Sequence, residues 1–201
     1  ALGQVARCAN FAQVTAVATS GGAIAAAAHQ VSMGLFYATL PFGDAVSQTA
    51  QAFLPAVVTP AARHNLRIRL AKLGAFTGLL CALLTALPLL VPALTRAFTS
   101  NIAISTAIIT LMPLVSVCAF AFSTASAAEG VLIAGRDLRP VAWLYAASPF
   151  LTAAALRVFW PLLSGSSTVP GALVAWAAFS TFHVTRFVVF AARAKWGQTR
   201  R

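Results

Sequence analysis

Long apolar runs with almost no charge dominate this sequence, and they restrict the chain to folds that keep such runs out of water. Of its 201 residues, 60% are hydrophobic and 8% are charged. Soluble domains typically carry about 25% charged residues, whereas about 20 consecutive apolar residues suffice to cross the hydrocarbon core of a bilayer. The sequence therefore predicts an all-α, multi-pass membrane protein whose surroundings are the lipid bilayer.

Six such runs follow one another, separated by short polar or basic segments, and they predict a bundle of six transmembrane helices. The predicted spans cover residues 2–20, 23–58, 73–95, 102–134, 141–163 and 170–192. The first is polar for a span, and we interpret it as truncated, within a fragment of a longer protein. Residues 60–72 are predicted to form a basic loop, and residues 193–201 a basic tail.

The basic residues indicate how the predicted bundle is oriented. One side of the membrane receives ten of them, namely Arg63, Arg67, Arg69, Lys72, Arg136, Arg139, Arg193, Lys195, Arg200 and Arg201. The opposite side receives Arg96 alone. Lys and Arg accumulate in cytoplasmic loops, so we expect the C-terminus on the cytoplasmic side, or on its equivalent in an organelle. The net charge of +11 does not indicate nucleic-acid binding, because the basic residues lie between apolar runs rather than along one face.

The second run carries polar side chains that recur along one face of its predicted helix. Four are seven residues apart, and a fifth falls between the last two: Gln30, Tyr37, Asp44, Gln51 and Gln48. Seven residues drift only about 20° around a helix, so these side chains form one stripe. Polar groups inside hydrocarbon are unfavourable and usually face a protein interior or a cavity. We therefore expect the stripe to line a pathway, with a kink in the helix at Pro41.

Two of the three acidic residues, Asp44 and Glu129, lie inside predicted spans. Such a carboxylate can exchange a proton or bind a cation, as an ion-coupled carrier requires; alternatively, it caps or pairs with a neighbouring helix. We expect Glu129 to reach water or Arg136, and Arg186 to extend to the membrane surface. His29 is expected to pack and hydrogen-bond rather than to relay protons.

The sequence shows no arrangement typical of an enzyme. His29, His64 and His183 lie on separate predicted elements, so they do not form a metal-binding motif. Neither a glycine-rich phosphate loop nor a zinc-protease or nucleophile-elbow motif occurs. We therefore expect a non-enzymatic protein without a cofactor.

Two segments resemble the multidrug and toxic compound extrusion (MATE) transporters, most closely their DinF-like branch. Residues 26–30 read AAAHQ and residues 42–52 read FGDAVSQTAQA, which is similar to the eighth span of that family. Residues 129–138 read EGVLIAGRDL, which is similar to the end of the tenth span. The resemblance extends over essentially the whole chain and identifies it as similar to the C-terminal six-helix lobe of a twelve-span transporter.

The resemblance implies secondary active efflux of small organic compounds, driven by inward proton or sodium flow, with alternating access between two lobes. Asp44 corresponds to the aspartate of the eighth span, and Gln30, Gln48 and Gln51 to positions that face the cavity. Glu129 replaces a commoner aspartate. The N-terminal six-helix lobe of the same polypeptide is the implied partner, and the likeness to plastid-type members implies a plastid envelope as an alternative to the plasma membrane. The alternative hypothesis is a non-transporting six-span scaffold or assembly subunit.

Overall fold

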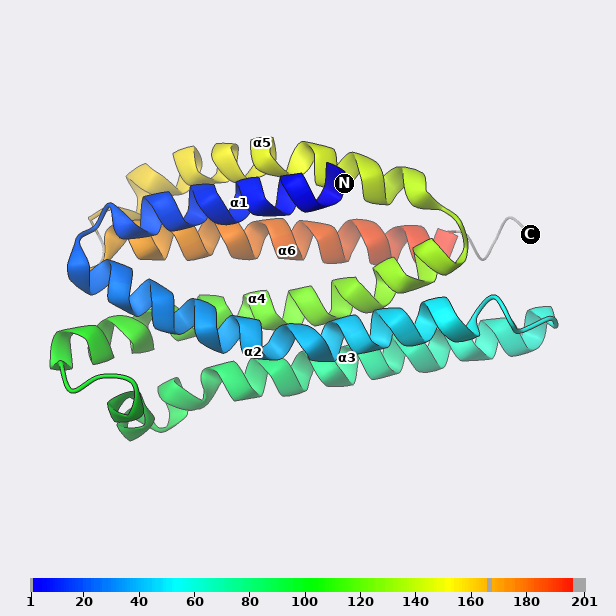
Figure 1. Cartoon of the computed structure of the whole chain (residues 1–201), viewed down its shortest axis with the longest axis horizontal. Coiled ribbons are helices and arrows are strands. Elements are labelled where there is room, and N and C mark those ends of the chain that lie inside the picture. The colour runs from blue at the N-terminus through cyan, green and yellow to red at the C-terminus, as the bar shows by residue number, and fades with distance from the viewer. Residues whose placement is uncertain (1, 166–167, 197–201) are drawn as a thin grey trace.

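The computed structural model describes residues 2–165 and 168–196, and these residues form a bundle of long helices (Figure 1). The elements are α1 (Leu2–Thr19), α2 (Ala23–Phe53), α3 (Pro60–Leu90), the short 3₁₀ helix η1 (Pro92–Ala97), α4 (Ile102–Ala134), α5 (Leu138–Leu163) and α6 (Pro170–Trp196). The predicted all-α fold is therefore confirmed for the described residues. The end of the predicted basic tail, residues 197–201, lies outside them.

Five helices within the described part, α2 to α6, are long and apolar enough to cross a membrane. These helices are consistent with the predicted multi-pass membrane protein. The first helix is not among them, and its 18 residues include Gln4, Arg7, Asn10 and Gln13. A sixth span therefore stays a prediction.

Helix α4 occupies the centre of the bundle and packs against α2, α3 and α6. Helix α6 in turn contacts α5 and α1, so the helices form two groups that meet along α4 and α6. Figure 1 shows the long helices lying side by side along the long axis of the molecule. Helices α4 and α6, from the second half of the sequence, thus pack against α1, α2 and α3 from its first half.

Glycines allow α4 to approach α2 and α3 closely. A Cβ atom at Gly130 would lie 2.6 Å from the Cα and from the carbonyl oxygen of Ser47 on α2. On the α3 side, a Cβ at Gly74 would lie 2.5 Å from the Cβ of Ala127. Small residues at such crossings are how transmembrane helices gain close packing. The α2–α4 and α3–α4 contacts therefore depend on the absence of a side chain.

The main core of the bundle joins α1, α2, α4 and α6, and Cys81 of α3 also belongs to it. Phe36 of α2 lies at its centre, with its ring centroid 6.0 Å from that of Trp176 and 5.5 Å from that of Phe179 in edge-to-face arrangements. Such pairs add about 0.5–1.5 kcal/mol beyond the burial of their area. These contacts position α2 against α6, and with it the polar stripe on α2.

The predicted loop over residues 60–72 is wrong, because these residues form the first turns of α3. Thr59 caps the helix by accepting a hydrogen bond from the Ala62 amide (3.4 Å), and Pro60 occupies its first turn, where proline is well tolerated. Basic residues on a helical surface need no loop to reach water. Helix α2 ends earlier than predicted, at Phe53, and α3 ends at Leu90.

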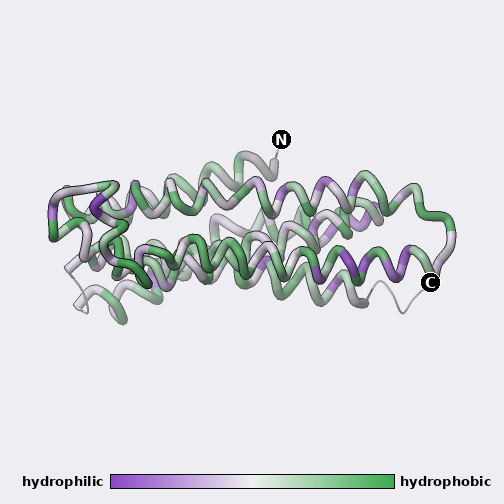
Figure 2. Tube along the Cα trace, turned by 90° about the horizontal axis from the view of Figure 1, so that it is seen from below, coloured by the Kyte–Doolittle hydropathy of each residue, from purple (hydrophilic) through white to green (hydrophobic). Residues whose placement is uncertain are grey.

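Helix α2 continues through Pro41, and its axis changes direction near its middle (Figure 1). The bend agrees with the expected effect of an internal proline. Hydrophilic segments gather in the half of the bundle where α2 ends and α3 begins (Figure 2). We name this half the basic end, because Arg63, Arg67, Arg136 and Arg193 lie together there.

Candidate functional site

The polar stripe of α2 lies on the exposed side of that helix. Its five members are Gln30, Tyr37, Asp44, Gln48 and Gln51, and all of them are exposed. The buried face of α2 is different and contains residues such as His29, Phe36 and Val46. The sequence periodicity therefore grouped the stripe correctly, and the tertiary structure places it at the surface of the bundle.

Local contacts orient several members of the stripe. The Gln51 side chain donates from Nε2 to the Oγ of Ser47 over 3.2 Å, one turn away on the same helix. The Tyr37 ring lies 5.7 Å, centroid to centroid, from the Phe11 ring of α1. The stripe therefore borders α1 near Tyr37, so α1 and α2 both contribute to this surface.

Glu129, the sixth predicted site residue, lies in the interior of the bundle, unlike the exposed stripe. It is buried, with 6% of its surface exposed. Tyr145 of α5 donates its hydroxyl to the carboxylate, at 2.9 Å from Oε2 and 3.2 Å from Oε1. The Arg186 guanidinium of α6 forms an ion pair with the same Oε2 atom. Glu129 thus joins α4, α5 and α6.

Arg186 does not extend to the membrane surface as expected, because it is buried with 2% of its surface exposed. Besides Glu129, its Nη2 donates to the Oγ of Ser126 over 3.2 Å. Its Cζ lies 5.1 Å from the centroid of the Phe122 ring and 5.7 Å from that of Tyr145, within cation–π range. The ion pair with the Glu129 carboxylate offsets the unfavourable desolvation of the buried guanidinium. The expected partner of Glu129, Arg136, is instead exposed at the basic end.

The structure therefore divides the predicted site residues into two places. The α2 stripe forms an exposed polar surface, whereas Glu129, Arg186, Tyr145 and Ser126 form a buried network. Tyr145 and Arg186 were missed as members of a network with Glu129. The available signal was that Glu129 and Arg186 both lie within apolar runs, where charged side chains need a partner.

The histidines of the core are packed rather than clustered. His29 is buried, and its Nε2 lies 3.3 Å from the Oγ1 of Thr15 on α1. This contact agrees with the expected packing and hydrogen-bonding role. His183 is surrounded by aromatic rings, with the Phe179 centroid at 4.6 Å. Within residues 2–165 and 168–196, the structure shows no group of three or more His, Cys, Asp or Glu side chains that could hold a metal ion.

Comparison of the chain with protein-family models, with curated proteins and with solved structures finds no match.

Proposed function

We propose that this chain is the C-terminal six-helix lobe of a MATE-type antiporter, which exports small organic compounds in exchange for protons or sodium ions. Alternating access would occur between this lobe and an N-terminal lobe of the same polypeptide. The proposal rests on the sequence resemblance of α2 and of the end of α4, and on the position of the polar stripe.

The position of the stripe is the observation that carries the proposal. Five polar side chains occupy an exposed face of one of the five apolar helices. Facing lipid, exposed polar side chains would lose their hydration, which is unfavourable by several kcal/mol for a group left without a hydrogen bond. A second lobe, with a water-filled pathway between the lobes, would keep this face in contact with water. This arrangement explains why an apolar helix keeps polar residues over three heptads.

Each member of the stripe has a chemistry that suits ion-coupled export. The Asp44 carboxylate can exchange a proton or bind a cation, and is the residue we assign to coupling. The amides of Gln30, Gln48 and Gln51 offer both donors and acceptors to an organic substrate. The Tyr37 ring can receive an aromatic or cationic group on its face. In this proposal Glu129 stays within the buried network with Arg186 and Tyr145, and this network joins α4, α5 and α6 as the lobe moves.

The basic end supplies the proposed orientation. Because Lys and Arg residues favour the cytoplasmic side of a membrane, we propose that this end faces the cytoplasm, or the stroma if the protein lies in a plastid envelope. Export would then proceed toward the end of the bundle that carries η1.

The test is transport by the full-length protein in sealed vesicles loaded with a fluorescent organic cation. We expect efflux when an inward proton or sodium gradient is imposed, and loss of efflux when a protonophore and a sodium ionophore dissipate both gradients. Efflux that persists unchanged without either gradient would contradict coupled antiport. Absence of any protein-dependent flux across a panel of cationic, aromatic and acidic compounds would favour the scaffold alternative.

A further inference from the structure

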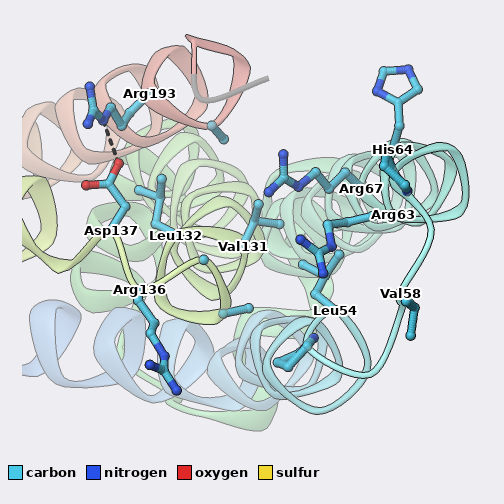
Figure 3. Close-up of a pocket in the computed structure, with 15 residues that line it drawn as sticks. Leu54, Val58, Arg63, His64, Arg67, Val131, Leu132, Arg136, Asp137 and Arg193 are labelled. Carbon is cyan, nitrogen blue, oxygen red and sulfur yellow. Dashed lines mark hydrogen bonds and ion pairs between the residues drawn. The ribbon is translucent and has the colours of Figure 1, made fainter. Parts of the chain in front are cut away.

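A pocket of about 470 Å³ opens at the basic end, and none of the five stripe residues lines it (Figure 3). It lies where α2 ends, α3 begins, α4 ends and α6 approaches its last turn. Its lining includes four arginines, Arg63, Arg67, Arg136 and Arg193, and one acidic residue, Asp137. A pocket lined by an excess of one sign of charge raises the local concentration of counter-ions, so this pocket attracts anions.

The two arginines from α3 are the ones positioned to bind an anion. Arg63 and Arg67 are four residues apart, so they lie on one face of α3, and in Figure 3 their side chains extend toward the middle of the pocket. Both are half-buried. The side chains of His64 and Arg136 extend away from the middle. An arginine pair of this kind presents planar N–H donors that suit the oxygens of a phosphate.

The opposite wall is already neutralised. The Nε of Arg193 donates to the Oδ2 of Asp137 over 2.6 Å, so the one acidic side chain of the pocket has a cation as partner. The last carbonyls of α4 are likewise satisfied, since the amide of Asp137 donates to Leu132 (2.9 Å) and that of Arg136 to Ile133 (2.9 Å). Neither the carboxylate nor these carbonyls would therefore strongly repel an anion held by Arg63 and Arg67.

The remainder of the lining is apolar, and this decides between classes of anion. Leu54, Val58, Val131 and Leu132 lie beside the arginines. Val58 is strongly exposed, at 89%, on the segment between α2 and α3. A free inorganic anion gains nothing from such a wall, whereas an amphiphile places its apolar part there. The N-terminus of α3, which also opens here, favours negative charge.

We propose that this pocket binds the phosphate headgroup of an anionic phospholipid from the adjoining leaflet. Arg63 and Arg67 hold the phosphate, and the glycerol and upper acyl carbons lie against Leu54 and Val58. Basic pockets between membrane-spanning helices bind anionic headgroups in this way. The inference does not depend on transport, and bound lipid would link the α2–α3 connection to the ends of α4 and α6.

The experiment measures thermal unfolding of the full-length protein in neutral detergent, titrated with short-chain phosphatidylglycerol. We expect a saturable rise in the unfolding midpoint that phosphatidylcholine and inorganic phosphate do not reproduce at equal concentration. The double variant R63Q/R67Q should raise the apparent dissociation constant about 30-fold, since each basic side chain near an anionic surface contributes about 1 kcal/mol. Stabilisation by inorganic phosphate equal to that by phosphatidylglycerol would overturn the lipid proposal, as would equal stabilisation by phosphatidylcholine.

A matched control removes the same charge from the same helix outside the pocket. Arg69 and Lys72 are exposed on α3 and do not line the pocket. The variant R69Q/K72Q should bind phosphatidylglycerol within about twofold of the wild type, and a loss as large as that of R63Q/R67Q would show diffuse attraction rather than a site. Arg63 also donates to the carbonyl of Val57 (2.9 Å). If R63Q/R67Q fails to fold, R67Q alone should show about a fivefold loss, and unchanged binding in R67Q would contradict the proposal.

Discussion

Arg186 of α6 and Glu129 of α4 form an ion pair in the interior of the bundle, where the two side chains are 3% and 8% exposed. The pair joins residues 57 positions apart and is completed by the Tyr145 hydroxyl. A charge left alone at such a place is strongly destabilising, whereas a matched pair is tolerated. The packing of α4 against α6 therefore depends on keeping both charges or neither.

Removing one partner of this pair should destabilise the protein far more than removing both. Glu129→Gln leaves the guanidinium of Arg186 buried without its counter-ion, and we expect a loss of about 3–5 kcal/mol in the free energy of unfolding. The double variant E129Q/R186M should lose less than E129Q alone. Unfolding in mixed detergent, followed by circular dichroism, measures all three proteins.

The surface pair Arg193–Asp137 provides the control for the buried pair. Its members are 52% and 30% exposed, so solvent screens their attraction. Asp137→Asn should reduce stability much less than Glu129→Gln does. Equal losses in the two variants would mean that burial does not determine the strength of the Glu129–Arg186 interaction.

Asp44→Asn should abolish or strongly reduce coupled efflux without unfolding the protein. The side chain is exposed on α2, so its replacement disturbs little packing, but the amide can neither exchange a proton nor carry the charge that binds a cation. We expect at least a tenfold lower initial rate, on the order of 1.4 kcal/mol, in the vesicle assay, from protein that circular dichroism shows to be folded at the assay temperature.

Thr49→Ala is the matched control for Asp44→Asn on the same helix. The Thr49 hydroxyl donates to the Ala45 carbonyl of its own helix over 2.8 Å and does not belong to the stripe. Efflux by this variant should match the wild type. Normal efflux by Asp44→Asn would exclude a coupling role and leave Asp44 with a structural one.

Gly130→Ala should separate α2 from α4. The added Cβ would lie 2.6 Å from the Cα and from the carbonyl oxygen of Ser47. These are backbone atoms, so the clash cannot be relieved by a change of side-chain rotamer and requires the two helices to move apart. Overpacking of this kind costs about 1–3 kcal/mol. The measurement is the free energy of unfolding in detergent.

Gly34→Ala tests the same substitution on α2 at a site with space. Apart from its chain neighbours and the local backbone of α2, no atom lies within 4 Å of a Cβ built at Gly34. Helix propensity favours alanine over glycine by about 1 kcal/mol, so this variant should be at least as stable as the wild type. If Gly130→Ala were equally harmless, the close approach of α2 to α4 would not constrain the bundle.

Arg136→Gly should increase stability in the absence of lipid. Arg136 has a φ of 56°, in the left-handed region, where α4 ends with hydrogen bonds from the amides of Arg136 and Asp137. Glycine is the residue that usually occupies this position of a helix terminus. We expect a gain of about 0.5–1 kcal/mol, limited by the greater entropy of glycine in the unfolded chain.

Arg139→Gly is the control for Arg136→Gly, since it removes a nearby arginine from the first turn of α5 rather than from a left-handed position. Thermal unfolding should show no rise in the midpoint for this variant, because no left-handed backbone conformation is relieved there. A lower midpoint for Arg136→Gly would show that its backbone conformation is not strained.

Sequence reasoning succeeded where a local pattern sufficed. Apolar runs predicted the helical segments, and heptad spacing placed Gln30, Tyr37, Asp44 and Gln51 on one face of α2. The prediction of a loop over residues 60–72 is wrong, because a basic composition does not distinguish a loop from an exposed helical turn, whereas Thr59 and Pro60 signal a helix start. The expected position of Arg186 is also wrong, because a basic residue near a helix end reaches water in some folds and a buried carboxylate in others.

The sequence by itself determined that the chain is helical and largely apolar, and that α2 carries one polar stripe, because these properties follow from residue type and helical periodicity. Only the tertiary structure decided that the stripe is exposed while Glu129 and Arg186 meet inside, and that four arginines from three segments share one pocket. The physical reason is that burial and pairing depend on how whole helices cross. Those crossings are set by contacts such as that of Gly130 with Ser47, between residues 83 positions apart.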